Sequence, residues 1–228
     1  MYLLLVLPEY VTTDMYKPYI DLAKKVFPNA NIVVDKFHIV QLLTRELNKL
    51  RINEMKKLNT RTREYKVLKR YWKIPLARKR DLNSIYFYKN RHFKNMTSSI
   101  DILDYMLKEF PNLKDAYDFY QNFLLSISKN DVAMLEDILN TRTDEIPMCF
   151  RKSVKSLKKL RKYVLNSLKY DYTNAMVEGK NNKIKVIKRV SYGYRSFRNF
   201  KARIMLMERY KIQKGNIHSY QFAMDAAA

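Results

Sequence analysis

The predicted helix at residues 174–190 carries a carboxylate, an amide and two cations on one narrow stripe. With 3.6 residues per turn, Glu178, Asn182 and Lys185 fall within about 60° of one another around the helix axis. Arg189 lies inside the same stripe, and no second acid stands in this segment. Solvated helices usually pair acids with bases four residues apart. The pattern favours a carboxylate that holds a metal ion ahead of cations that bind phosphates; the alternative is a surface helix with one ordinary glutamate.

Two further acids follow short β-prone runs near the start of the chain. Residues 10–13 (YVTT) end at Asp14, and residues 31–34 (NIVV) end at Asp35. The carboxyl ends of strands are where α/β sheets place their chemistry. The sequence therefore predicts two strands that each deliver an aspartate to the edge of a sheet.

The elements that position these residues are predicted to be mostly helical. Residues 15–27 have apolar side chains at helical spacing, with Pro18 in the first turn, where proline is tolerated. From His38 onward the pattern is helical almost throughout, and the chain has only 3 Gly and 6 Pro to interrupt it. The predicted helices cover residues 38–57, 98–109, 112–128, 132–140, 151–168 and 174–210, and the last of these is broken at Gly193.

The net charge predicts a polyanionic partner. Lys and Arg number 45 against 22 Asp and Glu, which gives +23 at pH 7 and a pI near 9.9. DNA, RNA and anionic membranes are the candidates, and the alternative is a generic basic surface. The cations of residues 60–94 and 152–162 are predicted to contact phosphates through bulk electrostatics and not by base reading.

Cysteine content and hydropathy exclude several other classes of protein. The single cysteine, Cys149, excludes an intramolecular disulfide framework and a multi-cysteine zinc site, and is interpreted as a small apolar residue. The apolar run at the N-terminus is about six residues long, far below the roughly 20 that span a bilayer. We interpret that run as a buried strand and expect no membrane association.

Three segments resemble the DDE transposases of bacterial insertion sequences, most closely the IS-L-three group. They are VTTDMYKPY around Asp14, NANIVVDKFHIV around Asp35 and His38, and NAMVEGKNNKIKVIKRVSYGYRSFRNFKARI around Glu178. The likeness runs along nearly the whole chain. It implies Mg²⁺-dependent cleavage and strand transfer of DNA in the cytoplasm of a bacterium, by an enzyme that commonly works as a homo-oligomer.

The resemblance also implies a fold and a domain organisation. Members have an α/β RNase H-like core interrupted here by a large all-α insertion, so the chain should be mostly helical. We expect a partial core at 1–45, the insertion at 46–170, C-terminal core helices at 171–215 and a frayed tail at 216–228. The first strands of the core are expected to be missing.

The resemblance assigns roles to the residues singled out above. Asp14 would be the second acid and Glu178 the third, and both would bind Mg²⁺ or Mn²⁺. Two such metals serve phosphoryl chemistry by activating the nucleophile and stabilising the leaving oxygen. Asp35 and His38 would support the site through an acid-x-x-His signature, although a lone histidine is equally well a partly buried structural residue.

The cations that follow Glu178 are expected to position DNA. The predicted DNA-binding residues are Asn182, Lys185, Lys188 and Arg189. Trp72, in a basic and aromatic segment, could stack on a DNA base, but we prefer to interpret it as a core aromatic of the insertion.

The family's first acid should precede Met1. Members place it on an upstream strand, and they carry N-terminal DNA-recognition modules. We expect the chain to supply two of three acids and to show negligible catalysis alone, as a truncated frame, a remnant or a fragment. The alternative function is a non-catalytic, basic helical module that binds nucleic acid.

Overall fold

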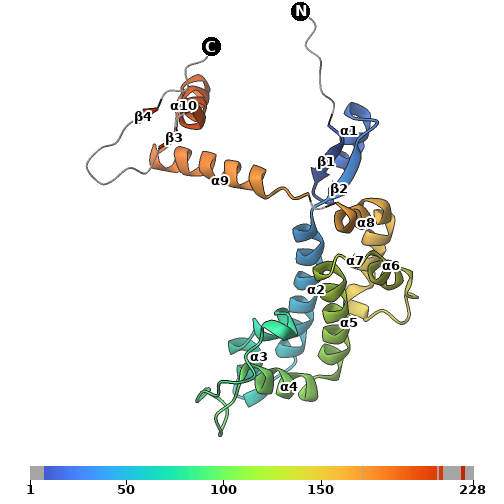
Figure 1. The fold of residues 1–228 in the computed structure, drawn as a ribbon. Coiled ribbons are helices and arrows are strands. Elements are labelled where there is room, and N and C mark those ends of the chain that lie inside the picture. The colour runs from blue at the N-terminus through green and yellow to red at the C-terminus, as the bar shows by residue number, and fades with distance from the viewer. Residues whose placement is uncertain (1–7, 171, 210, 213–221, 224–228) are drawn as a thin grey trace, which may run out of the picture. The chain divides into compact units, whose positions relative to one another are not determined.

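The computed structural model describes residues 8–170, 172–209, 211–212 and 222–223, and it is mostly helical, as predicted (Figure 1). Two compact units, Met1–Thr173 and Asn174–Ala228, make up the chain, and each is described by itself. The predicted N-terminal strand and all of the predicted frayed tail except Phe222–Ala223 lie outside the described residues.

The first unit begins with a parallel pair of strands, β1 (Tyr10–Thr13) and β2 (Asn31–Val34), at the bounds that the sequence predicts. In the register of the pair, Thr13 lies opposite Val34. Parallel neighbours need a crossover connection, and α1 (Lys17–Val26) supplies it. As a result, both strands end at the same edge, where Asp14 and Asp35 follow them.

Helices α1 and α8 pack against this small sheet. Ile20 and Ala23 of α1 form a buried cluster with Ile32 of β2. On β2, Ile32, Val33 and Val34 are all buried, and α8 (Arg161–Lys169) packs along this strand. The side chain of Asn166 on α8 donates a hydrogen bond to the Ile32 carbonyl at 2.9 Å, which fixes the helix to the strand.

Helix α2 (Lys36–Lys56) is the element around which the rest of the unit packs. It contacts α3 (Arg63–Arg70), α5 (Pro111–Ser128), α7 (Met148–Lys159) and α8. Its side chains at i, i+4 and i+8, namely Ile39, Leu43 and Leu47, are fully buried. This apolar stripe is the one that the sequence predicts.

The predicted helical segments from residue 98 onward are confirmed, with one split. They correspond to α4 (Ser99–Glu109), α5 and α6 (Val132–Asn140). The predicted single helix at 151–168 is instead two helices, α7 and α8, which meet at Leu160. The Leu160 side chain packs against both buried clusters, so a local turn there lets the two helices follow different surfaces.

The prediction of nearly continuous helix is wrong for residues 71–98. After α3 the chain forms only two 3₁₀ turns, Ile74–Leu76 and Lys79–Asp81, and then an irregular loop with one bridge between Tyr88 and Thr97. Pro75 cannot donate to a helical ladder. Asn83 bonds the following backbone through its side chain, a local alternative to helix.

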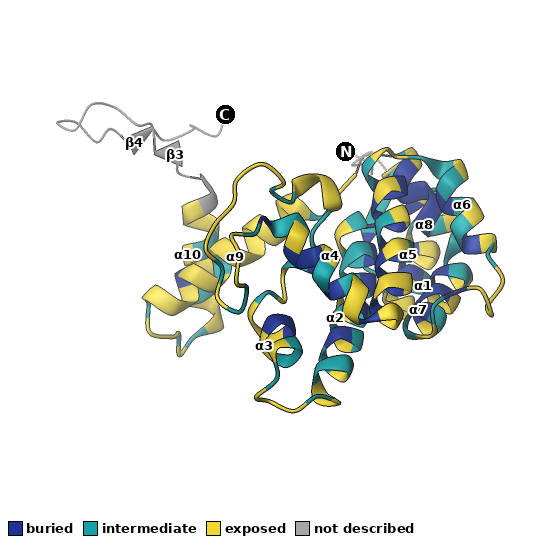
Figure 2. Cartoon of the chain, turned by 90° about the horizontal axis from the view of Figure 1, so that it is seen from below, coloured by how far each residue is buried: buried dark blue, intermediate teal, exposed yellow. Residues whose placement is uncertain are grey.

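The second unit contains α9 (Ala175–Val190) and α10 (Phe197–Arg209), whose residues are mostly exposed (Figure 2). The predicted break at Gly193 is confirmed, since Tyr192 and Gly193 adopt positive φ of 52° and 102°. Beyond α10, Lys211–Ile212 (β3) and Phe222–Ala223 (β4) pair antiparallel. In the part of the chain that the structure describes, no helix has the length and apolarity to cross a membrane.

A buried arginine joins α2 to α3 and gives a test of this packing. Arg51 is 5% exposed, and burial lowers the pKa of its guanidinium. Its side chain donates to the Leu68 carbonyl at 2.7 Å and to Asn48 at 2.9 Å. We expect Arg51→Met to lower the free energy of unfolding by about 2 kcal/mol, because a charged hydrogen-bond donor is lost and a buried carbonyl is left without it. Urea denaturation measures the change.

Arg45→Met on the same helix is the matched control, because Arg45 is exposed. Its removal should change stability by less than about 0.5 kcal/mol. An Arg51→Met chain as stable as this control would show that the bonds to Leu68 and Asn48 do not hold α3 in place.

Candidate active site and nucleic-acid interface

The shared edge of β1 and β2 places two aspartates side by side in the backbone. The amide of Asp35 donates to the carbonyl of Thr13 at 3.0 Å, which extends the parallel ladder to the residue before Asp14. The two carboxylates nevertheless have different surroundings. Because of that difference, Asp14 is a candidate for chemistry and Asp35 is a structural residue.

Asp14 lies at the rim of a cavity of about 250 Å³. It is partly exposed, and its Oδ1 accepts a hydrogen bond from the Tyr16 amide at 3.1 Å. The remaining lining comes from the chain just after Asp14 and from one face of α2, namely Met15, Tyr16, His38, Gln41, Leu42 and Arg45. The structure therefore brings Asp14 and His38 to one cavity, as their expected roles require.

Asp35 caps helix α2 and is not among the residues that line the cavity. It is 5% exposed, occupies the N-cap of α2 and accepts a hydrogen bond from the Phe37 amide at 2.8 Å. An N-cap carboxylate satisfies an orphan donor and interacts favourably with the helix dipole. By fixing where α2 begins, Asp35 sets the position of His38 one turn later.

His38 is partly buried on the first turn of α2. Its ring packs edge-on to Phe37, with 5.5 Å between ring centroids. The ring lines the cavity that Asp14 also lines. Its position satisfies both interpretations of the sequence, that of a packed histidine and that of a site residue.

Gln41 and Arg45 are cavity residues that the sequence reasoning missed. Arg45 is exposed, and its guanidinium donates a hydrogen bond to the Gln41 side chain. Both follow His38 at spacings of three and seven residues, so all three project from one face of α2. That spacing was the available signal. A guanidinium at this cavity can hold a phosphate by charge and by paired hydrogen bonds.

The predicted third acid and its cationic track lie on α9 in the second unit. Glu178 stands in the first turn, where the helix dipole favours a carboxylate. The predicted DNA contacts Asn182, Lys185, Lys188 and Arg189 are all exposed on the same helix, as Glu178 is. The structure describes this helix by itself, so the pairing of Glu178 with Asp14 stays a prediction.

The His, Cys, Asp and Glu side chains of the described segments are the possible metal ligands. Among them, no group of three His, Cys, Asp or Glu residues is arranged to hold a metal ion. At the Asp14 cavity the donors are one carboxylate, one amide and one imidazole. Mg²⁺ binds through one or two carboxylates and keeps water and phosphate ligands. The donors at this cavity therefore fit one such ion.

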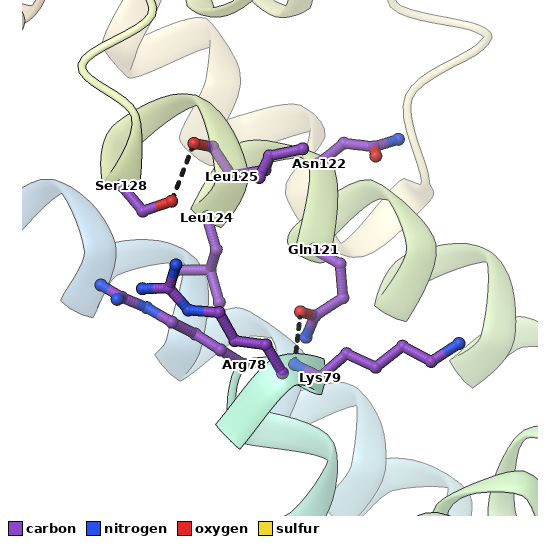
Figure 3. A pocket seen from close by; sticks show the side chains of 8 residues that line it. Arg78, Lys79, Gln121, Asn122, Leu124, Leu125 and Ser128 are labelled. Atoms are coloured by element: carbon purple, nitrogen blue, oxygen red, sulfur yellow. Dashed lines mark hydrogen bonds between the residues drawn. The ribbon is translucent and has the colours of Figure 1, made fainter. Parts of the chain in front are cut away.

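A second cavity, of about 220 Å³, lies between the 3₁₀ turn at Lys79–Asp81 and α5. Leu124 and Leu125 form apolar lining, and Arg78 and Lys79 also line the cavity (Figure 3). Arg80 is a further lining residue. These cations belong to the segment in which the sequence predicts phosphate contacts.

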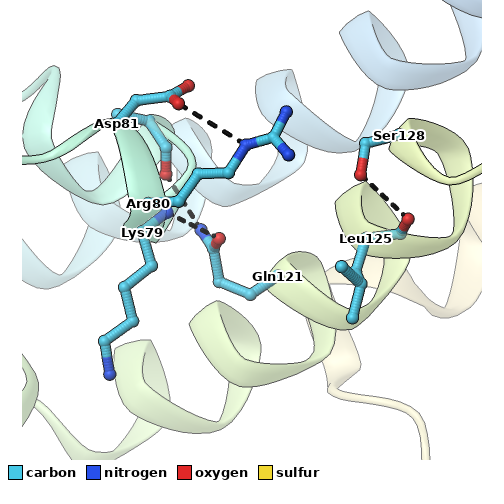
Figure 4. A network of polar contacts seen from close by, with 7 residues as sticks. Lys79, Arg80, Asp81, Gln121, Leu125 and Ser128 are labelled. Atoms are coloured by element: carbon cyan, nitrogen blue, oxygen red, sulfur yellow. Dashed lines mark hydrogen bonds and ion pairs between the residues drawn. The ribbon is translucent and has the colours of Figure 1, made fainter.

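Gln121 holds this basic turn against α5 through both atoms of its amide. Its Oε1 accepts from the Lys79 amide at 3.0 Å, and its Nε2 donates to the Ala77 carbonyl at 2.9 Å (Figure 4). Arg80 forms an exposed ion pair with Asp81 at 3.6 Å. The backbone of the turn is thus fixed while its cationic side chains stay at the surface.

Two other sequence interpretations have clear outcomes. The interpretation of Trp72 as a core aromatic is wrong, because its side chain is 41% exposed, with Lys73 Nζ 5.5 Å from the ring centroid. Cys149 behaves as an apolar residue, since burial raises the pKa of its thiol to about 11. Such a thiol is protonated at neutral pH and is a poor nucleophile.

Comparisons with known proteins identify a family for most of the chain. A family model described as Transposase, that of the IS-L-three group of DDE enzymes, matches residues 8–204. A Lactococcus lactis subsp. lactis protein named ATP-dependent protease is 38% identical over 121 residues, which cover 53% of this chain and 38% of that protein. The matched region is thus less than half of that relative's length. No solved structure matches the chain.

Because Asp35 caps α2, substitution of Asp35 should destabilise the chain more than substitution of Asp14. Asp35→Ala should lower the free energy of unfolding by about 1 kcal/mol or more, because an N-cap acceptor is lost. Asp35→Ser should restore most of that loss, since serine also caps. Urea denaturation of the whole chain measures each effect.

Asp14→Ala is the control at the neighbouring edge position. Its change in unfolding free energy should stay within about 0.5 kcal/mol, because its single described bond is local and exposed. If Asp14→Ala and Asp35→Ala were equally destabilising, the division into a cap and a cavity residue would be wrong.

Proposed function

The chain belongs to the DDE transposases of the IS-L-three group, and on that premise we propose that it carries residues of a catalytic region that cuts and joins DNA. The observation that supports the proposal most is the cavity at the edge of β1 and β2. There a partly exposed aspartate follows a strand and lies beside His38 and Arg45. A site for phosphodiester chemistry needs such an acid in basic surroundings.

Asp14 and Glu178 are proposed as the metal ligands. A bound Mg²⁺ or Mn²⁺ would supply an activated oxygen nucleophile and charge stabilisation for the leaving oxygen. Within this chain, the two carboxylates would hold the ion, and the Gln41 amide at the Asp14 cavity would be a further oxygen donor. Because family members use three acids, we expect the chain to cleave DNA negligibly when it supplies only these two.

The cations have a separate role in the proposal. Arg45 binds a phosphate oxygen at the cavity, and Lys185, Lys188 and Arg189 bind phosphates along α9 with Asn182 as a hydrogen-bonding partner. Each phosphate that a cation neutralises releases a counterion, so this contribution to affinity depends on salt and not on base sequence. The imidazole of His38 can donate a hydrogen bond to a substrate oxygen.

The architecture is compatible with the expected RNase H-like core. A β1–α1–β2 unit with parallel strands, followed by helices, is one piece of such a core. We propose that residues 1–45 and 171–215 belong to it and that 46–170 form the helical insertion. Assembly into a homo-oligomer on transposon ends belongs to the same proposal.

The main alternative is a function that binds nucleic acid without catalysis. A non-catalytic basic helical module would explain the charge of +23 without any metal. It would not explain why an acid at a strand edge lines a cavity with His38. The name of the Lactococcus relative is not carried over to this chain, because the match covers only 38% of that protein.

The two leading functions differ in how metal affects DNA binding. For the unmodified chain, we expect Mg²⁺ to tighten binding to a duplex oligonucleotide relative to EDTA, because an ion held by the carboxylates would attract a phosphate. Asp14→Asn and Glu178→Gln should each abolish the tightening and leave binding in EDTA unchanged or slightly stronger. Fluorescence anisotropy at fixed ionic strength measures the affinities.

The double variant Lys185→Gln with Arg189→Gln is the matched control on α9. It should weaken binding equally with and without Mg²⁺ and lower the salt slope by about 2. Binding that is indifferent to Mg²⁺, and that Glu178→Gln leaves untouched in both buffers, would favour the non-catalytic module.

A further inference from the structure

Residues 82–97, here called the aromatic loop, expose three consecutive rings to solvent. The exposed fractions of Tyr86, Phe87 and Tyr88 are 64%, 51% and 58%. The loop projects beyond α3 and α4 (Figure 1). Large rings left in water forgo the free energy that burial would provide, so a cluster of them marks a surface that binds something.

The loop holds these rings in a defined turn through two asparagines. Asn83 Oδ1 accepts from the amides of Ile85 at 3.1 Å and Tyr86 at 2.9 Å. Asn90 Nδ2 donates to the carbonyl of Thr97 at 2.8 Å and to its hydroxyl at 2.9 Å. Backbone bonds between Tyr88 and Thr97 close the turn. The rings are therefore pre-organised, which reduces the entropy lost on binding.

The base of the loop is attached to α3 and the residue that follows it. Arg63 on α3 donates to the His92 carbonyl at 2.8 Å, and its guanidinium lies 4.8 Å from the centroid of the Phe93 ring. The Tyr71 hydroxyl donates to the Arg91 carbonyl at 2.7 Å. These contacts attach residues 91–93 of the loop to α3 and to Tyr71, and they leave the three rings exposed.

The charge of the loop indicates the kind of partner. Its cations are Lys89, Arg91 and Lys94, all exposed, and residues 82–97 contain no Asp or Glu. The neighbouring turn adds the cations held in place by Gln121. A surface of rings interleaved with cations and free of acids suits a polyanion that also presents flat apolar faces. Single-stranded nucleic acid has both, whereas duplex DNA hides its base faces in the stack.

We propose that the aromatic loop binds single-stranded DNA by stacking unpaired bases on Tyr86, Phe87 and Tyr88 while Lys89, Arg91 and Lys94 hold the phosphates. The proposal rests on the proposed function only in taking DNA as the partner. It gives the helical insertion a task that is separate from the Asp14 cavity. The loop would engage DNA where strands have come apart.

The test compares the affinity of the whole chain for a single-stranded oligothymidylate and for a duplex of the same length, by anisotropy in EDTA. Replacement of all three rings by leucine keeps the apolar character and removes the stacking faces. Single-strand affinity should fall about tenfold or more, because stacking is worth about 1–3 kcal/mol per base. Duplex affinity and the salt slope should not change, since no charge is removed.

Two matched variants separate stacking from other effects. Tyr86→Phe with Tyr88→Phe keeps the rings and should retain single-strand affinity. Lys89→Gln, Arg91→Gln and Lys94→Gln together should weaken binding and lower the single-strand salt slope by about 2. Circular dichroism should be unchanged in each variant, because the substituted side chains are exposed.

Three results would overturn the proposal. They are full single-strand affinity in the leucine variant, an equal loss for duplex, or an altered sedimentation coefficient with unchanged DNA affinity. The last would place a second copy of the chain on the rings. Because EDTA removes any metal, these measurements do not depend on metal binding at Asp14, so failure here is distinguishable from failure of the metal site.

Discussion

The parallel pairing of β1 with β2 is the constraint on which the site in the first unit depends. Since the strands run in the same direction, α1 must cross between them, and both strands end at the same edge of the sheet. The bond from the Asp35 amide to the Thr13 carbonyl carries this pairing to the point where α2 begins. The face of α2 that bears His38 then lies beside Asp14, and the cavity follows from that placement. Buried Val33 and Val34 hold the strand in the unit's interior.

At this edge of the sheet, two aspartates differ in role: Asp35 is structural, and Asp14 is the candidate for metal binding. Asp35 is buried and caps α2, whereas Asp14 is partly exposed at the cavity. The cations are distributed differently. They lie on an exposed helix in the second unit and on fixed turns of the insertion, where Gln121 and the asparagines of the aromatic loop hold the backbone. The proposed function therefore assigns the carboxylate site and the phosphate-binding surfaces to separate parts of the chain.

Local patterns in the sequence predicted most of the regular elements. The strands at 10–13 and 31–34 were found because β-branched runs end at aspartates, and α2, α5 and α6 were found because their apolar side chains recur at helical spacing. The irregular segment after α3 was missed, because it depends on side-chain bonds such as those of Asn83 and on Gln121, which lies 42 residues from Lys79. The meeting of Asp14 and His38 could be predicted from the strand edge. The helical stripe of α9 predicted a metal-binding carboxylate at Glu178, but its pairing with Asp14 came from the family resemblance alone, since no local pattern specifies a partner 164 residues away.

The central claim is that Asp14 and Glu178 hold the same metal ion. Iron-mediated cleavage tests it most directly: Fe²⁺ replaces Mg²⁺ in the DNA-bound chain, and ascorbate and peroxide generate radicals that cut the backbone close to the metal. The account predicts cuts near both residue 14 and residue 178, and it predicts that Asp14→Asn or Glu178→Gln abolishes both cuts together. Cuts at only one of the two segments, or a loss confined to the segment that carries the substitution, would contradict a shared site.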